Sequence, residues 1–335
     1  MTFFIDPDIR KARTLPSDFY TDGAFFEASK NKVFARTWQL LGGPEIGTGL
    51  TPFTLLPGFL DEPVLLVKGG DSSHCLTNVC THRGKILVEE PCTANLIRCG
   101  YHGRRYSLDG KFLSMPEFDE AEDFPSPADH LQRLPLAERG GFYFTSIDPA
   151  GPLEDFLNAA DVEWPSGLRI TSAHEYQVEA HWALYCENYL EGFHIPYVHK
   201  ALNQIVDYGT YTTETFRYNS LQTGFDDDGK VAGRYLFIFP NLMFNFYPWG
   251  VSVNIVRPVS PSETVVEFLT YVSDESLTDK GAGADLHGVE LEDEAVVESV
   301  QKGIRSRFYS HGRYSPTREQ GTHHFHRLIA EFMAV

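Results

Sequence analysis

Two short segments of the chain pair a cysteine with a histidine, in a pattern suited to an iron–sulfur centre. The first is C-x-H, from Cys80 to His82, and the second is C-x-x-H, from Cys99 to His102. In a Rieske [2Fe-2S] centre, one iron keeps two cysteine thiolates and the other takes two imidazoles. Two loops that each supply one sulfur and one nitrogen can therefore hold both irons.

A structural zinc site is the alternative for these four side chains, because Zn²⁺ also binds two cysteines together with two histidines. Zinc-binding sequences usually group like ligands, with a C-x-x-C pair followed by a separate histidine pair. Here each segment mixes the two residue types. The order of the residues therefore favours the iron–sulfur interpretation.

A second group of possible ligands follows, where His194 and His199 are five residues apart with Pro196 between them. Taken alone, such a pair is also compatible with ordinary structural roles. Positions five apart superpose poorly on an unbroken helix of 3.6 residues per turn. Proline lacks an N–H and clashes with the preceding turn. We therefore expect the helix to end or kink near Ile195, so that His199 turns back towards His194.

Two histidines and one carboxylate form the facial triad of non-haem Fe(II) oxygenases, which leaves positions open for O₂ and substrate. The third ligand has to come from elsewhere in the chain. We select Asp293, at the start of a predicted C-terminal helix, with its neighbours Glu292 and Glu294 as the alternatives. The sequence thus indicates a mononuclear iron site in addition to the cluster.

The elements that position these residues form two predicted domains. Short apolar runs separated by glycine and proline, within residues 37–150, predict an all-β domain with both Cys/His segments in loops after strands. Residues 1–36 and 151–335 are assigned to an α+β catalytic domain with helices on a curved antiparallel sheet. Helices are predicted over residues 17–38, 183–195 and 289–309, and strands of the catalytic domain over residues 176–180, 235–239, 242–247, 252–256 and 264–272.

Composition limits the possible partners. The 335 residues include 46 acidic and 28 basic side chains, and the resulting net charge of -18 disfavours nucleic acids and anionic membranes. A transmembrane helix is excluded, because it needs about 18 or more consecutive apolar residues and no such run is present. The N-terminal residues lack the basic and apolar regions of a signal peptide. We expect a cytoplasmic protein that acts on a small molecule.

Together, the two motifs resemble those of the terminal oxygenase (alpha) subunits of Rieske non-haem iron oxygenases. Nearly the whole chain takes part in this resemblance. It implies a Rieske domain joined to a helix-grip (START-like) catalytic domain that holds mononuclear Fe(II) and uses O₂ as cosubstrate. The matching residues are Cys80, His82, Cys99 and His102 for the cluster motif, Glu191, His194 and His199 for the (D/E)-x-x-H-x4-H motif, and Asp293 for the distal aspartate.

The resemblance also implies protein partners. Electrons would come from NAD(P)H through a separate reductase, and in some systems a ferredoxin, because the chain has no G-x-G-x-x-G dinucleotide motif. The implied assembly is a homotrimer in which His102 of one subunit approaches Glu191 and His194 of the next. Arg104 occupies a position where many members have an aromatic residue, and we expect it to affect donor docking or hydrogen bonding at the cluster.

Glu191 narrows the branch of the family, since many members have aspartate at this position. Glutamate there resembles the choline, glycine betaine and carnitine monooxygenases. We therefore expect C–H hydroxylation or N-demethylation of a quaternary ammonium compound. Aromatic rings bind such cations, and the candidates for the pocket lining are Phe237, Phe239, Phe244, Phe246 and Trp249.

Two other functions fit parts of the pattern. An aromatic cavity accepts a planar ring equally well, so aromatic ring hydroxylation, including dioxygenation, or O-demethylation is the alternative within the enzyme class. A Rieske electron carrier with a non-catalytic ligand-binding domain belongs to a different class. The intact set of Glu191, His194, His199 and Asp293 argues against the carrier.

Overall fold

The computed structural model describes residues 3–70, 72–159, 162–199, 207–278, 283 and 286–335. The chain divides into two compact units, one spanning Trp38–Pro149 and the other combining Met1–Thr37 with Ala150–Val335. None of the helices in the described part of the chain combines the length and apolar character needed to cross a membrane.

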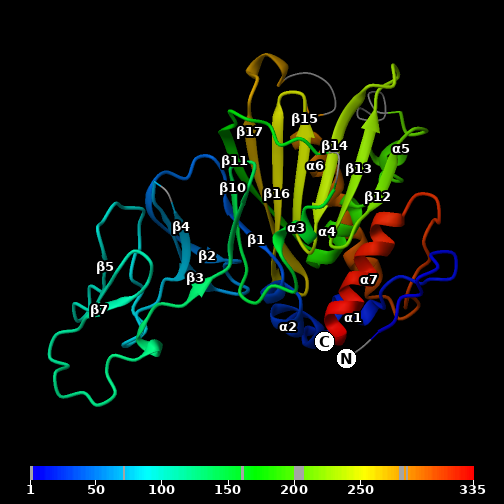
Figure 1. Cartoon of the computed structure of the whole chain (residues 1–335). Helices are drawn as coiled ribbons and strands as arrows, with labels where there is room; N and C mark the ends of the chain where they lie inside the picture. The colour runs from blue at the N-terminus through cyan, green and yellow to red at the C-terminus, as the bar shows by residue number, and fades with distance from the viewer. Residues whose placement is uncertain (1–2, 71, 160–161, 200–206, 279–282, 284–285) are drawn as a thin grey trace. The chain divides into compact units, whose positions relative to one another are not determined.

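The larger unit contains a seven-stranded antiparallel sheet (Figure 1). In the order in which they pair, its strands are β11 (Arg169–Val178), β17 (Glu263–Val272), β16 (Gly250–Ser260), β15 (Leu242–Tyr247), β14 (Val231–Ile238), β13 (Asn219–Phe225) and β12 (Thr212–Thr215). β-Branched and aromatic residues dominate the central strands and suit a pleated, half-buried surface. The antiparallel sheet predicted for the catalytic domain is confirmed.

Helices complete this unit and make it an α+β fold. They are α1 (Ser17–Thr21), α2 (Gly23–Lys32), η1 (Phe34–Arg36), α3 (Leu153–Phe156), α4 (Trp182–Tyr189), α5 (Ile195–Val198), η4 (Glu275–Leu277), α6 (Leu286–Ile304) and α7 (Gln320–Ala334). α4 packs on both β16 and α6, and α7 packs on β12. In Figure 1, α6 runs behind the strands of the sheet. The predicted α+β fold class is therefore correct.

The helix predicted over residues 183–195 is instead two short helices. Burial lowers the pKa of His181 to about 3, so its neutral ring accepts a hydrogen bond from the Ala183 N–H at 3.2 Å and caps α4. α4 ends at Tyr189, earlier than predicted. Pro196 lies in the first turn of α5, where its missing N–H is tolerated.

Two glycines allow close packing around the turn between α4 and α5. A Cβ on Gly192 would lie 2.9 Å from the ring of Tyr211. A Cβ on Gly321, in α7, would collide with the carbonyl oxygen of Leu190. The turn is therefore held by residues distant in sequence, which explains why the local pattern did not reveal where the helix ends.

The smaller unit is all-β and contains three antiparallel sheets. An apolar core of this unit includes Cys80 and Cys99 together with Leu65, Leu76 and Tyr106. The elements are β1 (Gln39–Gly42), β2 (Gly49–Leu55), β3 (Glu62–Lys68), β4 (Ser73–Thr77), β5 (Ile97–Arg98), β6 (Arg105–Tyr106), β7 (Phe112–Ser114), η2 (Pro127–Asp129), β8 (Arg133–Leu134), β9 (Leu136–Arg139) and β10 (Phe142–Thr145).

Arg104 is a buried structural residue of this unit, with 2% of its surface exposed. Its Nη2 lies 2.5 Å from Oδ1 of Asp129, and its guanidinium carbon lies 4.8 Å from the ring centroid of Phe112 and 5.4 Å from that of Phe124. This burial leaves the guanidinium no surface for a docking partner, so of the two expected roles, donor docking is wrong. The ion pair instead ties the second Cys/His loop to residue 129.

Asp129→Asn should destabilise the smaller unit by about 3 kcal/mol, because removing one partner of a buried ion pair leaves an uncompensated charge. The measurement is denaturant unfolding followed through the visible absorbance of the cluster. Glu89→Gln is the control, since the Lys85–Glu89 pair is exposed and its loss should not move the midpoint. Equal midpoints for Asp129→Asn and wild type would contradict the assignment.

Candidate metal centres

Backbone hydrogen bonds shape the two Cys/His segments into tight loops. The Cys80 N–H donates to the carbonyl oxygen of Lys85 at 2.8 Å, and the Cys99 N–H donates to that of Arg104, also at 2.8 Å. Both cysteines are buried in the core of the smaller unit. The strands before the loops, β4 and β5, thus deliver each pair of predicted ligands to a rigid position.

The four predicted cluster ligands lie close together. The ring centroids of His82 and His102 are 4.8 Å apart, and Cys80 lies within hydrogen-bonding reach of Cys99. The buried Nδ1 of His102 has no hydrogen-bond partner among the described residues. Buried polar atoms are normally paired, so this nitrogen fits a metal ligand. Two thiols and two imidazoles in this arrangement suit a Rieske [2Fe-2S] cluster.

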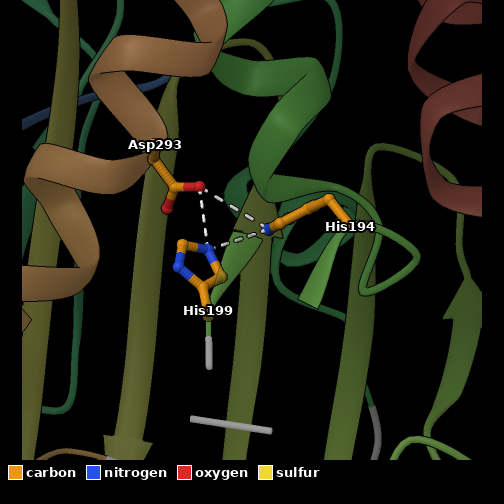
Figure 2. Close-up of side chains that lie close together, drawn as sticks. All are labelled: His194, His199 and Asp293. Atoms are coloured by element: carbon orange, nitrogen blue, oxygen red, sulfur yellow. Dashed lines mark hydrogen bonds and ion pairs between the residues drawn. The ribbon is translucent and has the colours of Figure 1, made fainter. Parts of the chain in front are cut away.

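His194, His199 and Asp293 converge on one point in the larger unit (Figure 2). The Nε2 atoms of the histidines are 3.1 Å apart, and Oδ1 of Asp293 lies 3.0 Å from Nε2 of His199 and 3.6 Å from Nε2 of His194. Ligands about 2.1 Å from an octahedral ion lie about 3 Å from their neighbours. The three donor atoms therefore fit one face of such an ion, as in the facial triad of non-haem iron.

Both histidines direct Nε2 to this point because a carboxylate occupies the other ring nitrogen. Nδ1 of His194 lies 2.7 Å from Oε1 of Glu191, and Nδ1 of His199 lies 2.8 Å from Oε2 of Glu292. Such contacts fix the tautomer and the ring orientation of metal-binding histidines. Glu191 is itself held by the backbone N–H groups of Phe193 and His194, which donate to its Oε2.

The geometry separates Asp293, the acid selected from the sequence, from its neighbour Glu292. Asp293 faces the Nε2 atoms of His194 and His199. Its Oδ1 also accepts a hydrogen bond from Asn188 at 2.6 Å. Glu292 binds the far side of His199. Burial lowers the pKa of His199, but the hydrogen bonds and charges of Asp293 and Glu292 outweigh it and raise the pKa overall. These anionic surroundings favour a cation at the centre.

A cavity opens directly beside the triad, with His194, His199 and Asp293 in its wall. Including its mouth, the empty space is about 790 Å³. Burial raises the pKa of Tyr235 to about 12 and raises the pKa values of the other four lining tyrosines well above their ordinary value, so all five phenols are neutral. These tyrosines are Tyr185, Tyr189, Tyr211, Tyr235 and Tyr247.

The predicted pocket lining is wrong, because none of its five aromatic residues lines this cavity. Side chains alternate along a strand, and on β15 it is Asn245 and Tyr247 that face the cavity. Phe244 and Phe246 lie on the opposite face of β15. There they pack on Trp164, with ring centroids 5.2 Å and 5.4 Å away.

The other three aromatic candidates belong to the core around the cavity. Phe237 and Phe239 pack against Phe325 of α7, with ring centroids 5.5 Å and 5.9 Å apart. Trp249 is buried and stacks on Tyr247 at 5.1 Å. These residues support the wall from outside and do not face the ligand space.

The sequence analysis also missed Glu290 and Tyr185, and their spacing contained a signal. Residues three or four apart share one face of a helix. Glu290 precedes Asp293 by three positions on α6, and Tyr185 precedes Tyr189 by four on α4, so each pair faces the same cavity. No comparable local signal marks Tyr211, because only the tertiary structure brings it to the site.

Two family models match the chain. Residues 57–125 match the Rieske [2Fe-2S] domain, and residues 206–335 match the ring hydroxylating alpha subunit (catalytic domain). The choline monooxygenase of Arabidopsis thaliana chloroplasts is 33% identical over 97% of this chain and 84% of the relative. The chain belongs to the Rieske non-haem iron oxygenases. It is an alpha subunit and an oxidoreductase, and its Rieske domain is the smaller unit.

Two further relatives place this Rieske oxygenase near the same branch. The carnitine monooxygenase oxygenase subunit of Escherichia coli K12 is 28% identical over 96% of this chain and 94% of the relative. The structure of the quaternary ammonium Rieske monooxygenase CntA in complex with L-carnitine superposes with a TM-score of 0.77 at 26% identity, covering 98% of this chain and 97% of the other. The expected resemblance to choline and carnitine monooxygenases is confirmed.

Replacing His194 or His199 with alanine should lower the iron content of this Rieske oxygenase from about three to about two atoms per chain, because only the mononuclear site loses a ligand. Iron analysis gives the count, and the visible spectrum shows that the cluster is retained. His174→Ala is the control, since His174 is exposed on β11. A count that stays at about three in both variants would refute the triad.

Proposed function

We propose that this chain is the terminal oxygenase of a multicomponent monooxygenase that hydroxylates a small quaternary ammonium compound of the choline, betaine or carnitine type. The observation that carries the proposal is the cavity beside the triad, whose wall combines five neutral tyrosines with carboxylates. Aromatic faces attract cations, and most strongly where water is excluded. The relatives named for choline and carnitine monooxygenation support the same class.

In this proposal, Cys80, His82, Cys99 and His102 hold the Rieske cluster, and His194, His199 and Asp293 hold mononuclear Fe(II). When bound, these groups supply single electrons and activate O₂. A separate reductase, with or without a ferredoxin, transfers the electrons from NAD(P)H. The tyrosines bind and orient the substrate, and the buried wall excludes bulk water from the reacting carbon.

The overall reaction consumes one O₂, two electrons and two protons for each C–H bond hydroxylated, and the second oxygen atom leaves as water. Hydroxylation of an N-methyl carbon gives a product that breaks its C–N bond, releasing formaldehyde, a tertiary amine and a proton. Hydroxylation of a carbon that already carries a hydroxyl gives a hydrate that loses water to form an aldehyde. The two outcomes identify which carbon lies next to the iron.

Single turnovers should distinguish this proposal from its rivals. Protein reduced with dithionite is exposed to O₂ with choline, glycine betaine, L-carnitine or a simple aromatic, and the products are identified by mass spectrometry. We expect formaldehyde or an aldehyde from a quaternary ammonium compound, and no hydroxylated aromatic. Conversion of the aromatic alone would replace the proposal with ring hydroxylation. Failure of all substrates, with about two irons per chain, would indicate an electron carrier.

We further propose that the enzyme works as a homotrimer, with Glu191 linking His194 to His102 of a neighbouring subunit. Aromatic side chains are exposed near both ends of this link. Tyr101 is 58% exposed and stacks on His102, while Tyr197, close to Glu191 in sequence, is 76% exposed. Exposed aromatic residues of this kind are typical of interface anchors.

Glu191→Gln should reduce substrate turnover about 100-fold while leaving both metals bound, since a positioning group beyond the ligands is lost. Turnover is measured as product formed per enzyme per unit time in the presence of the reductase, and iron analysis verifies loading. Glu214→Gln, at an exposed position on β12, is the control. Wild-type turnover in Glu191→Gln would remove Glu191 from the electron path.

A further inference from the structure

Glu290 is a buried carboxylate in the cavity wall that the metal site does not use. Only 4% of its surface is exposed. Its Oε2 accepts a hydrogen bond from the hydroxyl of Tyr185 at 2.7 Å, whereas its buried Oε1 has no hydrogen-bond partner among the described residues. Leaving a carboxylate oxygen buried without a partner is costly. Because Glu290 belongs to the wall of a ligand cavity, we expect the partner of its Oε1 to be a group of the ligand.

We infer that Glu290 is the anionic group that binds the quaternary ammonium ion of the substrate. The inference rests on the proposed function and assigns a specificity-determining residue within it. A quaternary nitrogen has no N–H, so it interacts with a carboxylate by charge and cannot be recognised by hydrogen bonds. An oxygen that no donor among the described residues approaches suits such a partner, because a quaternary ammonium ion makes contact through its surface and donates no hydrogen bond.

The position of Glu290 on α6 brings the bound cation to the reacting centre. Residues three apart on a helix have Cβ atoms about 5–6 Å from each other. Glu290 is therefore one turn from Asp293, the proposed iron ligand. An ammonium group held by Glu290 places its methyl or methylene carbons beside the triad. The hydrogen bond from Tyr185, on α4, fixes the carboxylate in this orientation.

The charges of the wall extend this inference to the class of cation. Glu191, Glu290 and Asp293 line the cavity, whereas neither lysine nor arginine occurs among the described residues of its wall. Among the described residues of the wall, a carboxylate on the substrate would meet these acids and no cationic side chain. The site should therefore prefer a cation with a neutral hydroxyl, as in choline, over a zwitterion, as in carnitine.

The electrostatic surroundings of Glu290 agree with this role. Burial raises the pKa of Glu290 well above its ordinary value; the hydrogen bond from Tyr185 opposes this shift, and the charges of Asp293 and Glu294 add to it. A bound cation lowers the pKa of Glu290, because it stabilises the ionised carboxylate. A neutral ligand of equal size gives no such stabilisation.

The test compares three ligands that differ mainly in charge. Isothermal titration calorimetry without O₂ measures their binding to the iron-loaded enzyme: choline, 3,3-dimethyl-1-butanol, in which carbon replaces the nitrogen, and L-carnitine, which adds a carboxylate. We expect wild type to bind choline at least about tenfold more tightly than either of the others. In Glu290→Gln, the preference for choline over the neutral alcohol should fall about tenfold, with binding of the alcohol unchanged.

Glu294→Gln is the matched control. Glu294 is one turn further along α6 and is also a partly buried carboxylate with an unpartnered Oε1 among the described residues, but it does not line the cavity. Its substitution should leave the ligand preference as in wild type. Glu290→Asp keeps the charge and should retain part of the preference, which provides the test if Glu290→Gln does not fold or does not load iron.

The outcomes separate this inference from the proposed function. An unchanged preference in folded, iron-loaded Glu290→Gln, an equal loss in Glu294→Gln, or complete loss in Glu290→Asp would overturn the role of Glu290. Equal binding of L-carnitine and choline by wild type would overturn the preferred class of cation. If wild type neither binds nor converts any quaternary ammonium compound, the proposed function itself fails.

Discussion

The candidate metal site depends on bringing three donor atoms from two distant stretches of chain to one point. His199 and Asp293 are 94 residues apart in sequence, yet their donor atoms lie 3.0 Å from each other. Ordering these side chains costs conformational entropy. The surrounding structure must therefore hold the carboxylate and the two imidazoles in fixed positions. The packing of α4 on β16 and α6 does so, together with the turn that Gly192 and Gly321 hold in place.

Carboxylates connect the metal centre with the ligand cavity. Glu191 and Glu292 bind the outer nitrogens of the two histidines, and Glu290 lies one turn from Asp293 on α6, in the wall of the cavity. Glu290 is buried, whereas Glu292 is about half exposed. In the proposed function, one set of charges thus orients the imidazoles, favours a divalent ion and selects a cationic substrate. The cost of burying several acids is consistent with a site built for cations.

Local sequence pattern predicted elements well where local forces decide them. The strand predicted over residues 242–247 is β15, because its alternating apolar residues suit a strand that packs on both faces. The helix predicted over residues 183–195 was too long, since Gly192 allows a close contact with Tyr211 that no neighbour in sequence reveals. The aromatic residues of β15 were likewise recognised, but the wrong face was chosen, because Trp164 covers Phe244 and Phe246.

The sequence by itself determined the family, because the two Cys/His segments and the histidine pair are short motifs. Their residue types and spacing are recognised in the sequence without knowledge of the fold. For the third candidate ligand, the sequence favoured Asp293, with the neighbouring Glu292 and Glu294 as alternatives. Only the tertiary structure directed Asp293 to the histidines and Glu292 behind His199, since the rotation of α6 about its axis depends on packing. The lining of the cavity also became known only from the tertiary structure. Tyr185, Tyr211 and Glu290 come together there from parts of the chain that are distant in sequence. Residues so far apart in sequence show no regular spacing from which the cavity could be predicted.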